Sequence, residues 1–364
     1  MKLEILAFAD FPSPYRVEVF KGLSAFYDLT VFFDKMSDQN RNAKWFCKDT
    51  GLHSYSLLTQ EGKIAFATAL KRISEYDLVL AYDYHIKNAI KLQARCMTKH
   101  VPYIMNLDGA FIRKNIFKNL VKRWLVSGAT AYFVSGKMAA EYFVHFGANP
   151  AKIYYHPFTS LHKDEILKSP ISEQQRMADR DFLGLPQRKT IISIGQFIHR
   201  KGFDILLESW RDLDNKYQLI IVGGGEEKST YKQIIHDKGY KNVQLMEFME
   251  KEQLFQYYYA ADAFVLPTRE DIWGLVVNEA MACGLPVITT DMCLASDELL
   301  KDTNSGYIVP VENAEALHNA MEKLLESDKS QEMGKNGLVK IREYTYENVV
   351  KAHVEAITKL MGRD

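Results

Sequence analysis

The stretch PTREDIWGLVVNEAMACGLPVI, residues 267–288, is the part of the chain that most clearly indicates its fold. An apolar strand is expected to end at Pro267, a charged loop follows, and a helix of small residues begins at Gly274. Asp271 lies on the loop and Glu279 near the helix N-terminus, where free N–H groups and the helix dipole favour anions. The pattern predicts a site for a polyol joined to a diphosphate, with carboxylates for the hydroxyls and the helix end for the phosphate. The alternative is a strand–loop–helix unit with ordinary surface acids.

The size and charge of the chain set outer limits. Its 364 residues are 47% hydrophobic, which predicts two domains rather than one. Residues 1–160 hold 21 Lys and Arg against 13 Asp and Glu, a net charge of +8, and the remainder holds 25 against 33, a net charge of −8. A basic first half is typical of a protein that meets an anionic partner, such as phospholipid headgroups or nucleic acid. An uneven surface without a partner is the alternative.

Cysteine spacing and the first residues indicate the compartment. The four cysteines show no paired Cys-x-x-Cys spacing, so we expect a reducing compartment, no disulfide framework and no zinc site. The opening MKLEILAFADF carries two acids within its apolar run and is interpreted as a strand rather than a signal peptide. Because no apolar run approaches the ~20 residues that span a bilayer, we expect a cytoplasmic protein that can still touch a membrane.

Short apolar runs alternate with helical patterns along the chain and form two series. The first series is Leu3–Ala9, Leu29–Phe33, Leu78–Ala81, Tyr103–Asn106 and Ala131–Ser135. The second series is Thr190–Ile194, Gln218–Val222, Val243–Met246, Ala263–Leu266, Val287–Thr289 and Tyr307–Val309. Such alternation predicts parallel sheets with crossover helices, and two series predict two doubly wound α/β domains. Ligands bind beyond the carboxyl ends of such strands, so we expect the domains to face a shared central cleft.

The second series opens with another signal for phosphate. Gly195 provides a tight turn after the strand TIISI, and Arg200 and Lys201 precede Gly202 at the start of a helix. Two cations and free amides at a helix N-terminus predict a diphosphate site. Cations at this end of a helix are unfavourable unless an anion is bound, which favours a functional interpretation over a solvated surface pair.

Three consecutive glycines, Gly223–Gly225, follow the strand QLIIV. Glycine lets the backbone approach a ligand closely, and a dinucleotide site is the rival interpretation. The pattern of three spaced glycines that opens a helix is missing, however, because Glu226 and Glu227 follow directly. The loop can also be a simple turn.

These segments, in this order, resemble the donor-binding domain of family 4 of the retaining glycosyltransferases, which have the GT-B fold of two Rossmann-like domains. The family pattern is a strand, a Gly and then Lys-Gly, followed by a Gly-rich turn and by an acid, seven residues, Glu and Ala. It is matched here by Gly195 to Gly202, Gly223–Gly225 and Asp271 to Glu279-Ala280, within about residues 190–310. The opening FPSPYRVEVFKGLSAFYDLTVFF resembles bacterial family members of surface-polysaccharide assembly.

The resemblance implies roles for particular residues. Lys201, helped by Arg200, would hold the donor diphosphate, Glu279 the ribose hydroxyls, and Asp271 the hydroxyls of the transferred sugar. The full implied donor set is Arg200, Lys201, Gly223, Gly224, Phe248, Met249, Glu270, Asp271, Gly274, Leu275, Val276 and Glu279, with Phe248 and Met249 beside the base. Asp271 stands where the family usually has Glu, which can shift work to Glu270. Two further departures are Gln196 in place of an Arg and Asp10–Pro14 in place of an N-terminal Gly-Gly loop.

Breaking a sugar–phosphate bond leaves negative charge on the departing diphosphate. Lys201, Arg200 and helix amides can stabilise that charge, so we expect neither a metal nor a cofactor beyond the donor. Retention in this family implies attack on the same face, with the leaving phosphate helping to deprotonate the acceptor. Asp108, after the strand YIMNL, stands where the family often places a His or Asp near the reacting sugar, and Asp83 and His85 are rivals at another strand end. Each of the three can also be a surface turn residue.

Predicted domain boundaries combine these patterns. Residues 1–163 are expected to form the first, acceptor-binding domain, residues 164–189 a polar connection, and residues 190–343 the donor-binding domain. In the GT-B fold the terminal helix, here residues 344–364, typically crosses back to pack on the first domain. A helix that caps its own domain is the simpler alternative.

A basic amphipathic segment, FIRKNIFKNLVKRWLV at residues 111–126, indicates a partner. Its apolar side chains recur at helical spacing, cations surround them, and the segment has no acid. This composition is typical of helices that lie on an anionic membrane surface, and it would suit an acceptor carried on a lipid. A helix that faces the core with a solvated basic back is the alternative.

We therefore expect a glycosyltransferase at the inner face of the plasma membrane, which moves a sugar from a nucleoside-diphosphate sugar, most simply UDP-linked, to a cell-surface glycan or lipid-linked oligosaccharide. We expect no nucleic-acid partner. A non-catalytic sugar-nucleotide-binding scaffold and an NAD-dependent Rossmann dehydrogenase are the alternatives. The sequence leaves open which sugar is moved, whether the donor carries UDP, GDP or ADP, and the acceptor and oligomeric state.

Overall fold

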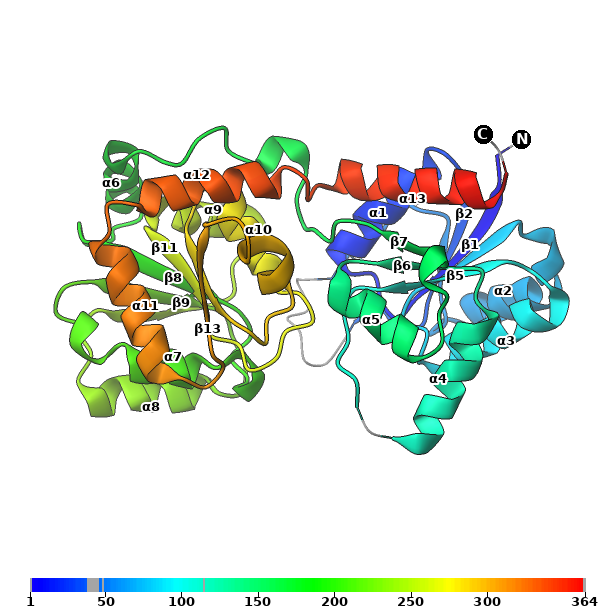
Figure 1. The fold of residues 1–364 in the computed structure, drawn as a ribbon, viewed down its shortest axis with the longest axis horizontal. Helices are drawn as coiled ribbons and strands as arrows, with labels where there is room; N and C mark the ends of the chain where they lie inside the picture. Colours follow the sequence, from blue (N-terminus) through cyan, green and yellow to red (C-terminus); the bar gives the residue numbers. More distant parts are fainter. Residues whose placement is uncertain (1, 38–45, 48, 114, 363–364) are drawn as a thin grey trace. The chain divides into compact units, whose positions relative to one another are not determined.

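The computed structural model describes residues 2–37, 46–47, 49–113 and 115–362. The chain divides into two compact units, which are treated separately. The first unit is Met1–Thr159 together with Tyr346–Asp364, and the second is Ser160–Thr345. Each unit is built on one parallel β-sheet (Figure 1). Over the described residues, none of the helices combines the length and the apolar character that a bilayer span requires.

The sheet of the first unit has the strand order β3-β2-β1-β4-β5-β6-β7. Its strands are β1 (Glu4–Ala9), β2 (Asp28–Phe33), β3 (Ser54–Ser56), β4 (Leu78–Ala81), β5 (Tyr103–Leu107), β6 (Ala131–Val134) and β7 (Ile153–Tyr155). All neighbouring pairs are parallel; in the β1–β2 register, for example, Ile5 lies beside Leu29. The order reverses between β1 and β4, which is the topological switch point of a doubly wound sheet.

Alternate residues of β1 explain why helices must cover both faces of this sheet. Leu6 and Phe8 belong to one buried apolar cluster, and Ile5 and Ala7 belong to another. Because neighbouring strand residues point to opposite faces, a strand that is apolar throughout needs protein on both sides. The helices of the unit are α1 (Pro14–Ser24), α2 (Gln60–Lys71), α3 (Lys87–Lys99), α4 (Ile116–Gly128), α5 (Lys137–His145) and α13 (Tyr346–Leu360).

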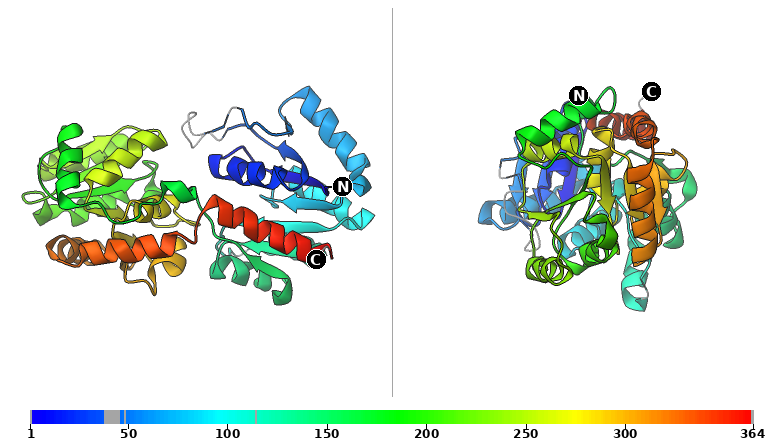
Figure 2. Two further views of the ribbon diagram at one scale, coloured as in Figure 1. Left: turned by 90° about the horizontal axis from the view of Figure 1, so that it is seen from above. Right: turned by 90° about the vertical axis from the view of Figure 1, so that its left-hand side faces the viewer.

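The terminal helix α13 lies against α1, as the views in Figures 1 and 2 show. A Cβ atom built on Gly22 of α1 would come within 2.3 Å of Val350 Cγ2 on α13, so only glycine leaves room for this approach. Val349 and Ile357 of α13 join the same buried cluster as Ile5. The last helix of the chain therefore completes the core of the first unit.

The sheet of the second unit has the strand order β10-β9-β8-β11-β12-β13, and all its pairs are parallel. Its strands are β8 (Thr190–Ile194), β9 (Gln218–Val222), β10 (Val243–Met246), β11 (Ala263–Leu266), β12 (Val287–Thr290) and β13 (Gly306–Val309). Its helices are α6 (Glu173–Phe182), α7 (Phe203–Ser209), α8 (Lys228–Lys238), α9 (Lys251–Ala260), α10 (Leu275–Ala282), α11 (Ala314–Glu326) and α12 (Ser330–Ile341). This is the strand order of a Rossmann sheet, with the switch point between β8 and β11. The prediction of two doubly wound parallel sheets is confirmed.

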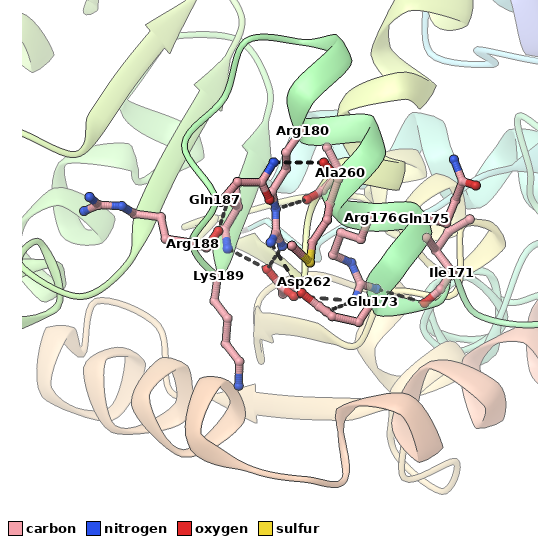
Figure 3. Close-up of polar contacts among 12 residues, drawn as sticks. Ile171, Glu173, Gln175, Arg176, Arg180, Gln187, Arg188, Lys189, Ala260 and Asp262 are labelled. Carbon is pink, nitrogen blue, oxygen red and sulfur yellow. Dashed lines mark hydrogen bonds and ion pairs between the residues drawn. The ribbon is translucent and has the colours of Figure 1, made fainter.

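The segment expected as a polar connection, residues 164–189, is an integral part of the second unit. It contains α6, whose Arg180 is buried and whose guanidinium donates to Asp262 Oδ2 at 2.5 Å and to the Ala260 carbonyl oxygen at 3.0 Å (Figure 3). Asp262 Oδ2 also accepts from the Thr190 amide at 2.6 Å. Two cations of this segment, Arg176 and Arg180, are thus paired inside the unit with Asp262 as their common partner.

Candidate functional site

The loops that follow β8 and β11 meet at the switch point of the second sheet. Gly202 has φ +69°, and a Cβ atom there would lie 2.1 Å from the Pro267 carbonyl oxygen, so the loops pack backbone against backbone. The Arg269 amide and the Thr268 hydroxyl both donate to the Arg200 carbonyl oxygen, at 2.8 and 3.0 Å. Gly202 therefore brings the two cations of the first loop against the acids of the second.

A buried ion pair joins these loops. Lys201 Nζ donates to Asp271 Oδ2, and both residues are less than one-tenth exposed. The Arg200 guanidinium lies 3.9 Å from Asp271 Oδ1 and donates to the Glu270 carbonyl oxygen at 2.6 Å. Burial acts to raise the pKa of Asp271, but Lys201 and Arg200 outweigh it and hold that pKa below its usual value. Four residues of the predicted set, Arg200, Lys201, Glu270 and Asp271, are thus brought together.

The structure changes one premise of the sequence-based prediction. We expected the cations before α7 to require a bound anion, but Asp271 itself supplies a negative charge to Lys201. Asp204, in the first turn of α7, adds another, and its carboxylate accepts from the Arg269 guanidinium at 2.7 and 2.8 Å. Electrostatics at this helix end are therefore balanced by the protein, and the case for a phosphate depends on the geometry of the pair.

Gly274 sets the approach to helix α10. Its φ is +91°, and a Cβ atom would lie 2.9 Å from Cys293 Sγ and 3.0 Å from Leu266 Cδ2. Directly before it, the Trp273 amide donates to Asp271 Oδ1 at 3.4 Å, a long bond that still orients the carboxylate. Gly274 thus lets the chain turn into α10 at Leu275 and Val276, whose amides belong to the unpaired first turn of a helix.

Glu279 lies on α10 and is partly exposed. It accepts hydrogen bonds from the Ser160 hydroxyl at 2.8 Å and from the Tyr258 hydroxyl at 3.2 Å. Its surroundings raise the pKa of the carboxyl, chiefly by burial, while Ser160 and the charge of Lys251 act in the opposite direction. The carboxylate is therefore already held by hydroxyl donors, the groups that a ribose also offers. Neither Ser160 nor Tyr258 was expected, and no sequence motif marks them.

Packing between two loops of the second unit explains two of the three glycines after β9. A Cβ atom on Gly223 would lie 1.9 Å from the Gly195 carbonyl oxygen, and one on Gly225 would lie 2.5 Å from the Phe197 carbonyl oxygen. Around Gly224, by contrast, a Cβ atom would meet no described heavy atom within 4 Å. Gly223 and Gly225 thus allow the loop after β9 to pack on the loop after β8, and Gly224 is the member with open space.

Phe248 and Met249 lie on the loop between β10 and α9. Met249 is buried and Phe248 is partly exposed. Strand β10 is separated from β8 by β9 in the sheet, so these residues follow a different strand end from Lys201. Their predicted place beside the base stays a prediction.

Asp108 lies at the carboxyl end of β5 in the first unit, in a second ion pair. Its Oδ2 accepts from the Arg16 guanidinium at 2.5 Å, and Arg16 lies with its Cζ atom 4.1 Å from the centre of the Tyr82 ring. Oδ1 of Asp108 is buried and has no hydrogen-bond partner among the described residues. Burial raises the pKa of Asp108, and Arg16 only partly offsets this. Arg16 was not singled out from the sequence, although it lies in the opening motif FPSPYRVEVF.

The two rivals of Asp108 differ from it. His85 is exposed, whereas Asp83 has φ +50°, which is rare for a residue other than glycine, and its Oδ2 accepts from the Asp10 amide at 3.0 Å. Asp10, Asp83 and Asp108 therefore follow the adjacent strands β1, β4 and β5 at one edge of the sheet. Asp108 is the one that a buried cation holds.

Two buried histidines, which were not identified from the sequence, lie near this pair. Their rings are 4.8 Å apart, with His156 following β7 and His353 on α13. His156 Nδ1 donates to the Pro157 carbonyl oxygen at 3.0 Å, and His353 Nδ1 donates to the Val349 carbonyl oxygen at 2.8 Å. Burial lowers the pKa of His156 to about 4 and that of His353 well below its usual value, so both are neutral at pH 7.

Comparisons with known proteins point to one kind of activity. Residues 175–339 match the family described as Glycosyl transferases group 1. An uncharacterized glycosyltransferase of Haemophilus influenzae is 30% identical over 48% of this chain and 52% of its own length. The chain spans about half the length, or less, of the curated relatives it matches.

Solved structures show the same fold over nearly the whole chain. Sucrose-phosphate synthase from Thermosynechococcus elongatus has a TM-score of 0.77 at 18% identity, with 99% of each chain covered. HepE of Anabaena, solved in complex with UDP, has a TM-score of 0.79 at 15% identity, with 98% of this chain and 100% of HepE covered. The two parallel sheets therefore form the GT-B fold.

Proposed function

We propose that the chain, whose residues 175–339 match the Glycosyl transferases group 1 family, is a retaining, metal-independent glycosyltransferase. Its donor is a nucleoside-diphosphate sugar, most simply a UDP-sugar. Its acceptor is a cell-surface glycan or a lipid-linked oligosaccharide, reached from the cytoplasmic face of the membrane. The second unit binds the donor and the first unit the acceptor.

The contact between Lys201 and Asp271 is the observation that carries this proposal. In a sugar diphosphate, the hydroxyls of the sugar and the oxygens of the phosphate lie on either side of the bond that breaks. A ligand of this kind needs an acid that accepts from hydroxyls directly beside a cation that binds phosphate. Asp271 and Lys201 form such a pair, and Arg200, which is less buried, adds a second cation next to them.

Departure of the diphosphate is the step that these residues would assist. As the bond between sugar and phosphate breaks, negative charge grows on the leaving oxygen. Lys201 and Arg200 would stabilise that charge from fixed positions, because the loop contacts around Gly202 hold them in place before the donor arrives. Two cations that act in this way support a mechanism without a metal ion. The leaving phosphate would then take the proton from the acceptor hydroxyl on the same face, which gives retention.

Glu279 would bind the ribose. Its carboxylate already accepts from two hydroxyls, those of Ser160 and Tyr258. A ribose diol would provide the same kind of donor at this partly exposed carboxylate. HepE, which shares the fold, was solved in complex with UDP, and this supports uridine as the nucleoside of the proposed donor. Gly224, with open space around it, is the member of the glycine loop that can approach the nucleotide.

Asp108 would act in the first unit, near the reacting sugar. Its free Oδ1 is the atom that can accept from a substrate hydroxyl, while Oδ2 stays bound to Arg16. A carboxyl whose pKa is raised by burial can also hold a proton. We assign Asp108 to positioning of the substrate or to transfer of a proton.

Calorimetry with UDP, GDP, ADP and NAD is the experiment that tests the donor class. Glu279→Gln keeps the volume and one carbonyl oxygen but removes the negative charge, so it tests the ribose contact with little disturbance to Ser160 and Tyr258. We expect one nucleoside diphosphate to bind and Glu279→Gln to weaken it. If NAD alone binds, the protein is a dehydrogenase and the proposal is wrong. Binding without any donor hydrolysis would indicate a scaffold.

A further inference from the structure

Helix α4 of the first unit presents an apolar face to solvent. Phe117, Leu120, Val121 and Trp124 are 84%, 60%, 42% and 45% exposed. These positions follow the i, i+3, i+4, i+7 spacing, which places them on one side of a helix. Ile112, just before the helix, is 52% exposed as well. The alternative that this stripe faces the core does not agree with these exposures.

The helix is attached at its C-terminal end and projects from the unit at its N-terminal end (Figures 1 and 2). Leu125 and Val126 are buried, and their carbonyl oxygens accept from the hydroxyls of Tyr103 and Tyr132, each at 2.5 Å. At the other end the Asn115 side chain caps the helix by accepting from the Lys118 amide at 3.0 Å. The helix is therefore anchored at one end and capped at the other, and much of its apolar face stays exposed.

The charges around this face have one sign. From residue 109 to residue 140 the sequence has no acid, and Lys118 and Arg123 lie on either side of the apolar stripe, both exposed. Lys122 differs, because its Nζ lies 5.2 and 5.1 Å from the ring centres of Tyr142 and Phe146 and is held by its own unit. Lys118 and Arg123 are thus the described cations of the helix that remain available to a partner.

We propose that α4 docks on an anionic phospholipid bilayer, with Phe117, Leu120, Val121 and Trp124 at the level of the acyl chains and Lys118 and Arg123 among the headgroups. The combination of an apolar face, flanking cations and a Trp is what a bilayer interface accommodates. A second copy of this chain would bring the same cations against each other, which disfavours pairing of two α4 faces. The proposal goes beyond the donor assignment and does not depend on it, because α4 belongs to the first unit.

Flotation of the full-length protein with two kinds of vesicle tests the proposal. One is made of phosphatidylcholine alone, and the other contains about one-third phosphatidylglycerol. We expect binding to the anionic vesicles, and Lys118→Gln with Arg123→Gln to weaken it about 25-fold, since each cation near such a surface contributes about fivefold. Phe117→Ser should weaken binding to the anionic vesicles as well. The matched control is Lys91→Gln with Lys99→Gln, which removes the same charge from exposed positions of α3 and should leave binding unchanged.

Trp124 provides a second, independent measurement. It is exposed, whereas Trp210 and Trp273 are buried. We expect anionic vesicles to shift the emission of the wild type to shorter wavelength and brominated lipids to quench it, and the shift to be lost in Trp124→Phe. Absence of binding to anionic vesicles, or equal binding by the charge variant and its control, would overturn the proposal. So would self-association that Phe117→Ser abolishes, because the face would then serve a second copy.

Discussion

A buried ion pair lies at the carboxyl end of the sheet in each unit of the molecule. In each pair a cation that follows the unit's first strand meets an aspartate that follows a later strand. In the second unit, β8 and β11 are neighbours, and Lys201 reaches Asp271 directly across the switch point. In the first unit β4 lies between β1 and β5, and Arg16 passes over the ring of Tyr82 to reach Asp108. The net pKa shifts of the two aspartates are nevertheless opposite, since the pKa of Asp271 is lowered and that of Asp108 is raised.

The number of cations and hydrogen-bond donors around each carboxylate explains why the two pKa values shift in opposite directions. Asp271 has Lys201, the nearby Arg200 and the Trp273 amide, which together lower its pKa despite burial. Asp108 has one cation and one oxygen without a partner, and burial raises its pKa. A buried carboxylate therefore stays ionised only when several donors replace the water it has lost.

Neutralising each aspartate in turn should give the largest difference in stability between the two ion pairs. Asp271→Asn leaves Lys201 buried without its partner, and we expect the second unit to lose about 3–5 kcal/mol of unfolding free energy. Asp108→Asn should cost the first unit less, because the fold already favours the neutral form of that carboxyl. Hydrogen exchange of peptides from each unit measures both values in one experiment. Equal losses, or the reverse order, would contradict the comparison.

Lys201→Ala tests the proposed role of the positive charge of the buried pair in turnover. Loss of one fixed group that stabilises the leaving diphosphate should lower turnover of the nucleotide sugar about 10²–10³-fold. Lys238→Ala, an exposed lysine at the end of α8, is the matched control. The double variant Lys201→Ala with Asp271→Ala removes the unpaired buried charge, so it should regain stability without regaining turnover. Near-normal turnover of Lys201→Ala would show that the lysine does not bind phosphate.

As pH falls, the first unit should lose stability before the second unit does. The pKa of His156 is about 4 in the folded chain against 6.5 ordinarily, so the unfolded state binds a proton that the folded state refuses. Stability contributed by the neutral form is present above pH 6.5 and is lost as pH falls toward 4. Between pH 7.5 and pH 5 we expect a loss of about 2 kcal/mol from His156, and a further loss from His353, whose pKa is also lowered by burial. Asp271, whose pKa is lowered, gives up its contribution only below its ordinary value of 3.8.

Exchange measured at the two pH values, after correction for intrinsic rates, checks this order. In His156→Gln the loss for the first unit should become smaller but should not vanish, since burial still lowers the pKa of His353. The second unit serves as the internal control. A loss of equal size in both units would mean that the buried histidines are not responsible.

Arg200→Gln should have the smallest effect. Its guanidinium is 3.9 Å from Asp271 and two-fifths exposed, so water screens the interaction. We expect less than about 1 kcal/mol of stability to be lost and the pKa of Asp271, followed by NMR, to move toward its usual value. A loss as large as that of Asp271→Asn would show that Arg200, and not Lys201, holds the carboxylate.

Much of the fold could be predicted from the sequence, because buried parallel strands are apolar throughout. Each apolar run that we singled out is a strand, and Gly274 does begin helix α10. The two strands that were not predicted, β3 and β7, are three-residue edge strands that are only partly buried, so they lack the apolar signal. The segment 164–189 gave no sign of packing in the second unit, because Arg180 looks like a surface charge until its partner, Asp262, is known.

The candidate site could be predicted only in part. The types of residue after β8 and β11 indicated phosphate and hydroxyl ligands, but the pairing of Lys201 with Asp271 depends on which strands are neighbours, and a sequence does not state strand order. Arg16 was missed for the same reason, since its acid lies more than ninety residues away. Ser160 and Tyr258 donate to Glu279 from separate segments, and neither has a distinctive neighbourhood in the sequence.

The return of α13 to the first unit has a consequence for synthesis of the protein. The first sheet is complete by Tyr155, yet the surface of α1 around Gly22 stays uncovered until Tyr346–Leu360 has been made. At 5–20 residues per second, the intervening Ser160–Thr345 takes roughly 10–40 s to translate. During that time the second unit can fold to completion while an apolar surface on the first waits for its last helix. A chain cut short before Tyr346 would therefore contain a whole second unit and a first unit that lacks part of its core.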